Sequence, residues 1–123
     1  MGIRATVAYL RYRLPLAQLA VMTLLPRADC RTWAKATDYC AQRKRGTLPG
    51  PMTESIDRVN DRLVALYGAS AVERVHLLQC HGLFITHPGQ VDPELSPDFL
   101  HPSLLGYKKL ALECLLPFIR RWL

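Results

Sequence analysis

A short apolar run near the start of the chain most constrains its fold. Residues 17–25 read Ala-Gln-Leu-Ala-Val-Met-Thr-Leu-Leu and are followed by Pro26. The apolar side chains occupy successive positions rather than alternate ones, a pattern typical of a strand that is covered on both faces. Strands of this kind belong to parallel sheets that lie between helices. The run therefore predicts an α/β fold.

Helical patterns precede and follow this run. Their spacing predicts helices over residues 4–14, 53–67 and 103–122. Thr53 is expected to cap the second helix, and Pro117 to kink the third or end its regular part. The side chains expected to face the core are Ala8, Leu10, Tyr12 and Leu14, then Ile56, Val59, Asn60, Leu63 and Leu66, then Leu104, Tyr107, Ala111, Leu115, Phe118 and Trp122.

Only one further strand is clear, over residues 72–80. Two strands do not suffice, because the first has the composition of a central strand that needs a neighbour at each edge. Either a strand lies unrecognised within residues 28–50, or partner strands lie upstream of Met1. We favour the second interpretation, in which residues 1–123 are the C-terminal portion of a single domain that is incomplete at its N-terminus.

The charge balance is basic, with 16 Lys and Arg against 10 Asp and Glu. The densest cluster, residues 43–45, has no interleaved aromatic side chains, so a solvated loop is favoured over a nucleic-acid site. No apolar run approaches the roughly 20 residues that a membrane span needs. Residues 1–6 fit the short myristoylation pattern, which often occurs by coincidence.

The four cysteines show no Cys-x-x-Cys spacing, and no secretory signal precedes them. These features predict a reduced, cytoplasmic protein in which Cys114 is a free thiol within an apolar helix. Cys80, His81 and His87 match no zinc-binding spacing, so we expect no metal and no cofactor.

Asp98 and His101 stand three residues apart, just before the final helix. A carboxylate at this spacing can reach the near ring nitrogen, fix the tautomer and stabilise the imidazolium that forms in general-base catalysis. On spacing alone the simpler interpretation is helix capping by Asp98 or Ser103, with His101 an ordinary surface residue.

Three segments resemble a known family. Residues 98–102, Asp-Phe-Leu-His-Pro, with Gly-Tyr at 106–107, resemble the last conserved block of the SGNH (GDSL) hydrolases, most closely the platelet-activating-factor acetylhydrolase-like branch. Residues 24–27, Leu-Leu-Pro-Arg, and the Ile-x-x-Val-Asn-x-x-Leu pattern at 56–63 are similar to earlier segments of that family. All three occur in the family's order and spacing.

The resemblance implies a three-layer flavodoxin-like fold and the hydrolysis of carboxylic or lipid esters through an acyl-enzyme. It also implies that His101 is the general base and Asp98 its orienting partner. A serine from the family's first block would be the nucleophile, and Gly and Asn from later blocks would complete the oxyanion hole.

The chain departs from the family where the nucleophile should be. It has no Gly-Asp-Ser near its start and no Gly-x-Asn-Asp, and its single asparagine, Asn60, is assigned to packing. None of its serines, at positions 55, 70, 96 and 103, follows an early strand. We therefore expect the chain to be inactive alone.

Two functions follow from this departure. In the first, the chain is part of a serine esterase and acts on an ester substrate once an upstream segment or a partner chain supplies the serine. In the second, it is a non-catalytic remnant that binds another chain at the sheet edge beside residues 19–25.

Overall fold

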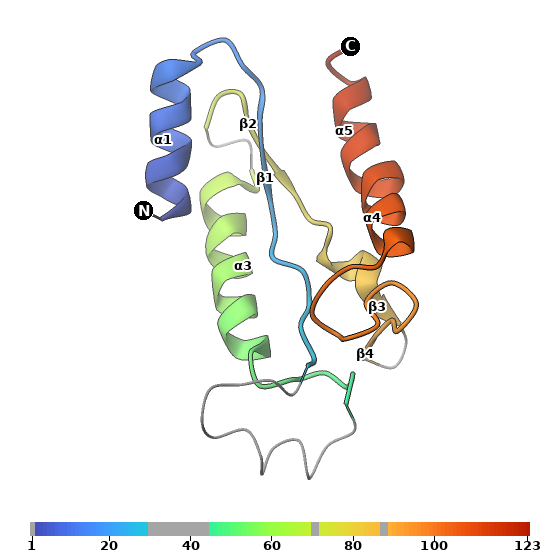
Figure 1. Cartoon of the computed structure of the whole chain (residues 1–123). Helices are drawn as coiled ribbons and strands as arrows, with labels where there is room; N and C mark the ends of the chain where they lie inside the picture. Colours follow the sequence, from blue (N-terminus) through green and yellow to red (C-terminus); the bar gives the residue numbers. More distant parts are fainter. Residues whose placement is uncertain (1, 30–44, 70–71, 87–88) are drawn as a thin grey trace.

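The computed structural model shows a small parallel sheet flanked by helices (Figure 1). Its strands are β1 (Leu19–Met22) and β2 (Val75–Leu78), with Leu19 opposite Val75 and Met22 opposite Leu78. This parallel pairing confirms the α/β class. The structure describes residues 2–29, 45–69, 72–86 and 89–123.

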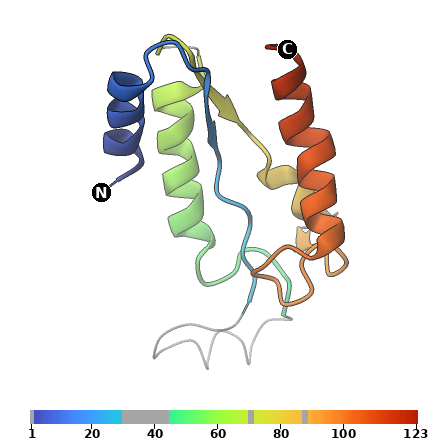
Figure 2. The same cartoon turned by 45° about the horizontal axis from the view of Figure 1, so that its top comes forward.

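Helices lie on both sides of the strand pair (Figures 1 and 2). On one side are α1 (Ile3–Arg13) and α3 (Thr53–Tyr67). On the other side is a continuous helical segment that consists of α4 (Leu104–Leu110), a π-helical stretch (Ala111–Leu115) and α5 (Leu116–Arg120).

One hydrophobic core lies beneath α1 and α3, and we call it the α3-side core. Val75, only 1% exposed, and Val21 supply its strand residues, and Leu77 packs against it from β2. Because alternate strand side chains point to opposite faces, these residues share one face of the sheet. The buried members of the α3-side core are Val7, Val21, Leu63, Tyr67 and Val75.

The other face of the sheet packs on a second core, which we call the α4-side core. Met22 and Leu78 pack against it from the strands. The ring of His76, on the same face, lies 5.3 Å from that of Phe118 and 5.0 Å from that of Trp122. Helices therefore lie over both faces of the strand pair, as the apolar run predicted, although Ala20 of β1 is exposed. The buried members of the α4-side core are Cys80, Phe84, Leu95 and Leu110.

The connection from β2 to α4 contains short elements of its own. A short 3-10 helix, η1 (His81–Phe84), leads into the antiparallel strands β3 (Ile85–Thr86) and β4 (Gln90–Val91). Thr47 forms an isolated bridge with Gln90. The strand considered within residues 28–50 falls largely on residues 30–44, which lie outside the described ranges.

The expected faces of two helices are wrong in part. On α1, Tyr12 is 82% exposed and Ala8 and Leu14 are exposed, whereas Val7 is buried. On α4, Leu104 is 87% exposed and Tyr107 57% exposed. The buried positions of α4 are instead Gly106 and Leu110.

The reason for the difference on α4 is a close backbone approach. A Cβ at Gly106 would lie against the carbonyl oxygen of Leu95 and 3.0 Å from the Phe84 ring. The helix therefore turns its smallest residue to the core rather than its largest apolar side chains. The π-helical stretch just before Pro117 then changes the helical phase, so one stripe does not continue along residues 103–122. Trp122 is half exposed at the end of this segment.

Helix α3 agrees better with its sequence pattern. Asn60 and Leu63 are buried as expected, and the helix ends before Gly68. Val59 is 37% exposed, however, and Tyr67 takes its place in the core. Thr53 begins the helix instead of capping it, because its hydroxyl accepts a hydrogen bond from the Gly50 N–H at 2.7 Å.

The expectation of a free thiol at Cys114 is wrong. Cys80 and Cys114 form a disulfide whose Cα atoms lie 5.9 Å apart, a usual separation. Cys80 follows β2 and Cys114 lies in the π-helical stretch, so the bond ties the final helical segment to the sheet. Cys30 and Cys40 lie outside the described ranges.

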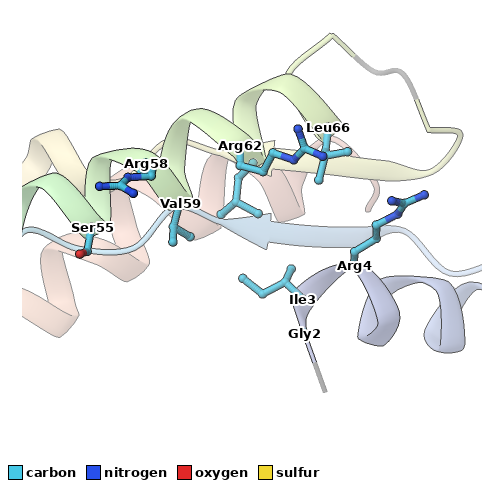
Figure 3. Close-up of a pocket in the computed structure, with 9 residues that line it drawn as sticks. Gly2, Ile3, Arg4, Ser55, Arg58, Val59, Arg62 and Leu66 are labelled. Carbon is cyan, nitrogen blue, oxygen red and sulfur yellow. The ribbon is translucent and has the colours of Figure 1, made fainter.

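An open groove runs between α1 and α3, on the opposite side of the strand pair from the α4-side core (Figure 3). Its volume is about 620 Å³.

Within the described ranges, no helix has both the length and the apolar character needed to cross a bilayer.

Candidate active site

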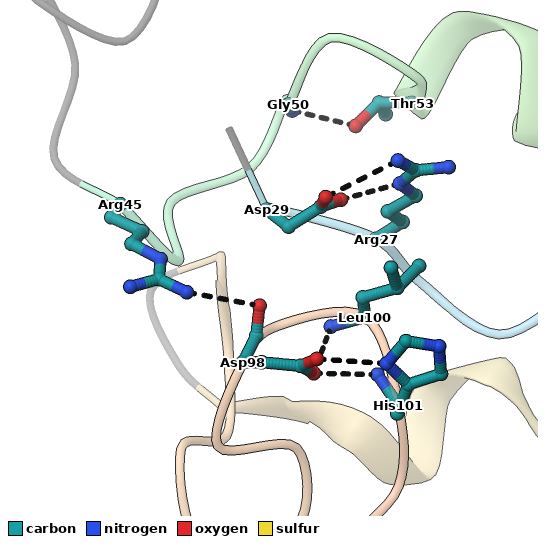
Figure 4. Close-up of polar contacts among 8 residues, drawn as sticks. All are labelled: Arg27, Asp29, Arg45, Gly50, Thr53, Asp98, Leu100 and His101. Carbon is teal, nitrogen blue, oxygen red and sulfur yellow. Dashed lines mark hydrogen bonds and ion pairs between the residues drawn. The ribbon is translucent and has the colours of Figure 1, made fainter. Parts of the chain in front are cut away.

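Asp98 and His101 meet in the loop before α4 (Figure 4). Asp98 Oδ2 lies 2.7 Å from Nδ1 of the His101 ring. Its Oδ1 accepts hydrogen bonds from the backbone N–H of His101 at 2.7 Å and of Leu100 at 3.0 Å. The Asp98 carboxylate thus accepts backbone hydrogen bonds that form the turn and also holds the His101 ring. The capping role and the catalytic role that the sequence suggested for Asp98 are therefore compatible.

The hydrogen bonds around Asp98 keep its carboxyl group ionised. The hydrogen bond from the His101 backbone N–H, then that from its ring, hold the pKa of the Asp98 carboxyl well below its usual range; the Leu100 N–H adds to this, and partial desolvation opposes it. An ionised Asp98 can only accept, so Nδ1 of His101 must be the donor. The other ring nitrogen, Nε2, is then the one that can accept a proton.

The backbone around the pair is set by its neighbours. Phe99 has a φ of 59°, and its N–H donates to the Ser96 carbonyl at 2.9 Å. The Ser96 hydroxyl donates to the carbonyl of His101 at 3.1 Å. Ser96 is 3% exposed, so this hydroxyl serves the loop conformation.

Ser103 caps α4, as the sequence suggested. Its hydroxyl accepts a hydrogen bond from the Gly106 N–H at 3.1 Å and donates to the Glu94 carbonyl at 2.7 Å. The Ser103 N–H donates to the Leu95 carbonyl at 2.8 Å. The start of α4 and the beginning of the loop are therefore fastened together on either side of His101.

A contact distant in sequence supports the loop from the other side. The Arg45 guanidinium donates to the Asp98 carbonyl at 3.5 Å and lies 5.5 Å from the centre of the Phe99 ring. Gly46, with a φ of 89°, lies beneath the same ring, where a Cβ would be 2.6 Å away. Arg45 of the basic cluster thus contacts the candidate site; Arg43 and Lys44 lie outside the described ranges.

Sequence reasoning missed a charged pair at the end of β1. Arg27 Nε and Nη2 donate to Asp29, whose side chain is fully buried. The hydrogen bond to Asp29 raises the pKa of Arg27. Charged residues directly after an apolar strand were the available signal, because sites in α/β sheets form at the carboxyl ends of strands.

Asn60 has the packing role expected of it, in a specific form. Its Oδ1 accepts from the Leu24 N–H at 2.7 Å, and its Nδ2 donates to the Leu24 carbonyl at 3.1 Å. The amide thereby satisfies both backbone groups of one residue just beyond β1.

His81 lies half-buried beside the same strand end. Its Nδ1 is buried and has no hydrogen-bond partner among the described residues. With Asn60 and Arg27 it lines a cavity of about 40 Å³, room enough for a water molecule. The metal interpretation fails for Cys80, which is in the disulfide. The described residues hold no group of three metal-binding side chains, and His87 lies outside them.

No serine hydroxyl within the described ranges is hydrogen-bonded to the His101 ring. Ser96 and Ser103 bond to backbone groups, and Ser55 lies on α3. Ser70 lies outside the described ranges. The His101 side chain is 71% exposed, so its ring is open to a group from elsewhere.

Comparison with known proteins gives two kinds of similarity, although no protein-family model matches the sequence. Two relatives, each named platelet-activating factor acetylhydrolase IB subunit alpha1, come from Pongo abelii and Bos taurus. Each is 31% identical over 117 residues, which are 94% of this chain and 42% of the relative. The chain thus spans less than half the length of these relatives.

A solved structure from Streptococcus pneumonia, described provisionally as a platelet activating factor, has the same fold over the matched part. Its TM-score is 0.62 at 22% identity, and the match covers 89% of this chain and 45% of that one. The sequence and structure comparisons confirm the resemblance that the motifs indicated: this chain is similar, over nearly its whole length, to part of the platelet-activating-factor acetylhydrolase-like proteins.

Proposed function

We propose that the chain supplies the acid–base half of an SGNH-type active site that hydrolyses carboxylic or lipid esters. His101 is the general base and Asp98 its orienting partner. The observation that carries the proposal is the 2.7 Å contact between Asp98 Oδ2 and His101 Nδ1, which leaves Nε2 available. In this proposal, residues 1–123 are the C-terminal portion of a three-layer flavodoxin-like domain.

The chemistry follows from the state of the pair. Nε2 of His101 takes the proton of a serine hydroxyl as the serine oxygen attacks the ester carbonyl carbon. Asp98 stabilises the imidazolium, which then gives its proton to the departing alkoxide and leaves an acyl-enzyme. A water molecule then attacks the acyl-enzyme carbonyl carbon and gives its proton to Nε2. The imidazolium returns that proton to the serine oxygen as the carboxylic acid is released.

The serine is supplied by an upstream segment or by a second chain. The exposure of His101 supports this, because a working base of this kind lies in a covered site. One edge of β1 pairs with β2, and no strand pairs with its other edge among the described residues. A parallel strand added at that edge would place its own carboxyl end beside those of β1 and β2, where sites of α/β sheets form.

Complementation tests the proposal. The chain is co-expressed with the remaining part of a platelet-activating factor acetylhydrolase IB subunit alpha1, and ester hydrolysis is measured on a short-chain ester. We expect activity only from the mixture. In that mixture His101→Ala should lower turnover by several orders of magnitude, and Asp98→Asn by up to about 10⁴-fold.

Asp92→Asn is the matched control. Asp92 lies in the same loop region and accepts the Glu94 N–H at 2.8 Å, but it holds no histidine. Its substitution should leave turnover within a few-fold of the parent. An Asp98→Asn mixture that is as active as the Asp92→Asn mixture would refute the role given to Asp98.

A non-catalytic interaction module is the alternative, and one observation favours it: within the described ranges no serine bonds to the His101 ring. In this case the free edge of β1 binds a strand of another chain, and His101 is dispensable. Partner binding that survives His101→Ala, together with no hydrolysis in any complemented mixture, would select this alternative.

A further inference from the structure

The groove between α1 and α3 has an apolar floor and a basic rim (Figure 3). Ile3 from α1 and Val59 and Leu66 from α3 supply apolar lining, and Arg4, Arg58 and Arg62 stand around them. These residues come from elements other than the loop that holds Asp98 and His101, so the groove is separate from the candidate active site.

The rim is electrostatically one-sided. Among the described residues, none of those that line the groove is acidic. Arg58 pairs with Glu54 at 2.6 Å, an exposed contact that is easily exchanged. Arg4 and Arg62 are exposed, and their side chains form no hydrogen bond or ion pair with other described residues. Guanidinium groups above an apolar floor favour an anion that also carries apolar surface.

We propose that this groove binds a single-chain anionic amphiphile, namely a carboxylate with a medium-length acyl chain. Its volume of about 620 Å³ is in the range of small-molecule sites. The floor follows α3 from Ser55 to Leu66, about 16 Å at the helical rise, which suits an extended acyl chain. The acyl chain covers the floor, and the carboxylate meets the arginines.

Other occupants fit less well. A second copy that used the same groove would bring its own three arginines against these, since a two-fold contact places like surfaces together. A partner helix, about 10–12 Å across with its side chains, is too bulky for a groove of this volume. The inference does not depend on the proposed esterase function.

Isothermal titration of the 123-residue chain with dodecanoate, below its micelle concentration, tests the proposal. We expect one saturable site, no binding of acetate, and much weaker binding of dodecyltrimethylammonium, which has the same chain and the opposite charge. Arg62→Gln should weaken dodecanoate binding about three- to five-fold, as loss of a partly exposed ion pair does. Arg13→Gln, on α1 but outside the groove, should change it by less than about two-fold.

A second pair of variants tests the floor. Val59→Trp fills the groove and should abolish binding, whereas Val64→Trp, at a similarly exposed position of α3 that does not line the groove, should not. Circular dichroism checks that each variant is folded. Equal affinity for the cationic and anionic amphiphiles, or dodecanoate binding unaffected by both Arg62→Gln and Val59→Trp, would overturn the proposal.

Discussion

The two cores of the molecule are built from different kinds of structure. Every buried member of the α3-side core comes from a helix or from one of the paired strands. In the α4-side core, Cys80 and Leu95 lie in connections and Phe84 in a single 3-10 turn, so only Leu110 comes from an α-helix. The α3-side core packs helices against the strand pair. The α4-side core packs against the strand pair and, in addition, positions the loop that carries Asp98 and His101.

Leu95 lies three residues before Asp98, and its carbonyl accepts the Ser103 N–H beyond His101. Damage to the α4-side core should therefore disturb both stability and the geometry of the pair. Damage to the α3-side core should lower stability alone.

The largest effect is expected from Phe84→Ala in the α4-side core. Phe84 is 1% exposed, and removal of a buried phenyl ring costs about 3–5 kcal/mol. Urea denaturation measures this loss, and the amide NMR signals of Leu100 and His101 should shift as well. Leu63→Ala, in the α3-side core, is the comparison: we expect a loss of about 2–5 kcal/mol with those signals unchanged. Equal shifts in both variants would erase the distinction between the cores.

Gly106→Ala should also act on the α4 side. The new methyl group would press on the Leu95 carbonyl and the Phe84 ring, and overpacking of this kind costs about 1–3 kcal/mol. Thermal unfolding gives the loss. Gly82→Ala is the control, because a Cβ at Gly82 meets no atom within 4 Å. If both variants melt together, the close approach at Gly106 is not what sets the face of α4.

Asn60→Ala should lower the stability of the chain on the α3 side without changing the contact between Asp98 and His101. It removes the donor and the acceptor that serve Leu24, and backbone groups left unsatisfied cost about 1–3 kcal/mol. Asp61→Ala, at an exposed neighbouring position, should stay within about 0.5 kcal/mol of the parent. Urea midpoints compare the two, and equal midpoints would show that water replaces the amide.

The smallest effect concerns pH. Because the pKa of Asp98 is lower in the folded chain than the ordinary value of about 3.9, its contribution to stability is present above that pH. It is lost as the pH falls further, toward the folded pKa. The stability difference between the parent and Asp98→Asn should therefore shrink as the pH falls below about 4. A difference that persists unchanged at pH 2.5 would exclude the carboxylate as its source.

What could be predicted from the sequence depended on local signals. The ends of α1 and α3 follow from helical spacing, and the parallel pair from an apolar run on successive positions. The contact between Asp98 and His101 was also predictable, because both residues lie in one turn. The catalytic role proposed for the pair came from the resemblance to the SGNH hydrolases and not from the spacing.

The features that escaped prediction depend on segments far apart in the chain. Cys80 and Cys114 are separated by 34 residues, and no spacing rule joins them. The contact of Arg45 with Asp98 spans 53 residues. The buried face of α4 is set by the close approach of Gly106 to the Leu95 backbone, and a hydrophobicity pattern does not reveal such an approach. Each of these is decided by tertiary packing.

Side chains along β2 point alternately to the two faces of the sheet, and this alternation limits where the strand pair can accept an insertion or a deletion. Val75 and Leu77 face one side, and His76 and Leu78 the other. Deletion of one residue within the strand would exchange the two sets, and would place an imidazole among aliphatic side chains. A change of length in the turn before β2 keeps that assignment. We therefore expect a change of length within these four residues to be more disruptive than one in the segments on either side.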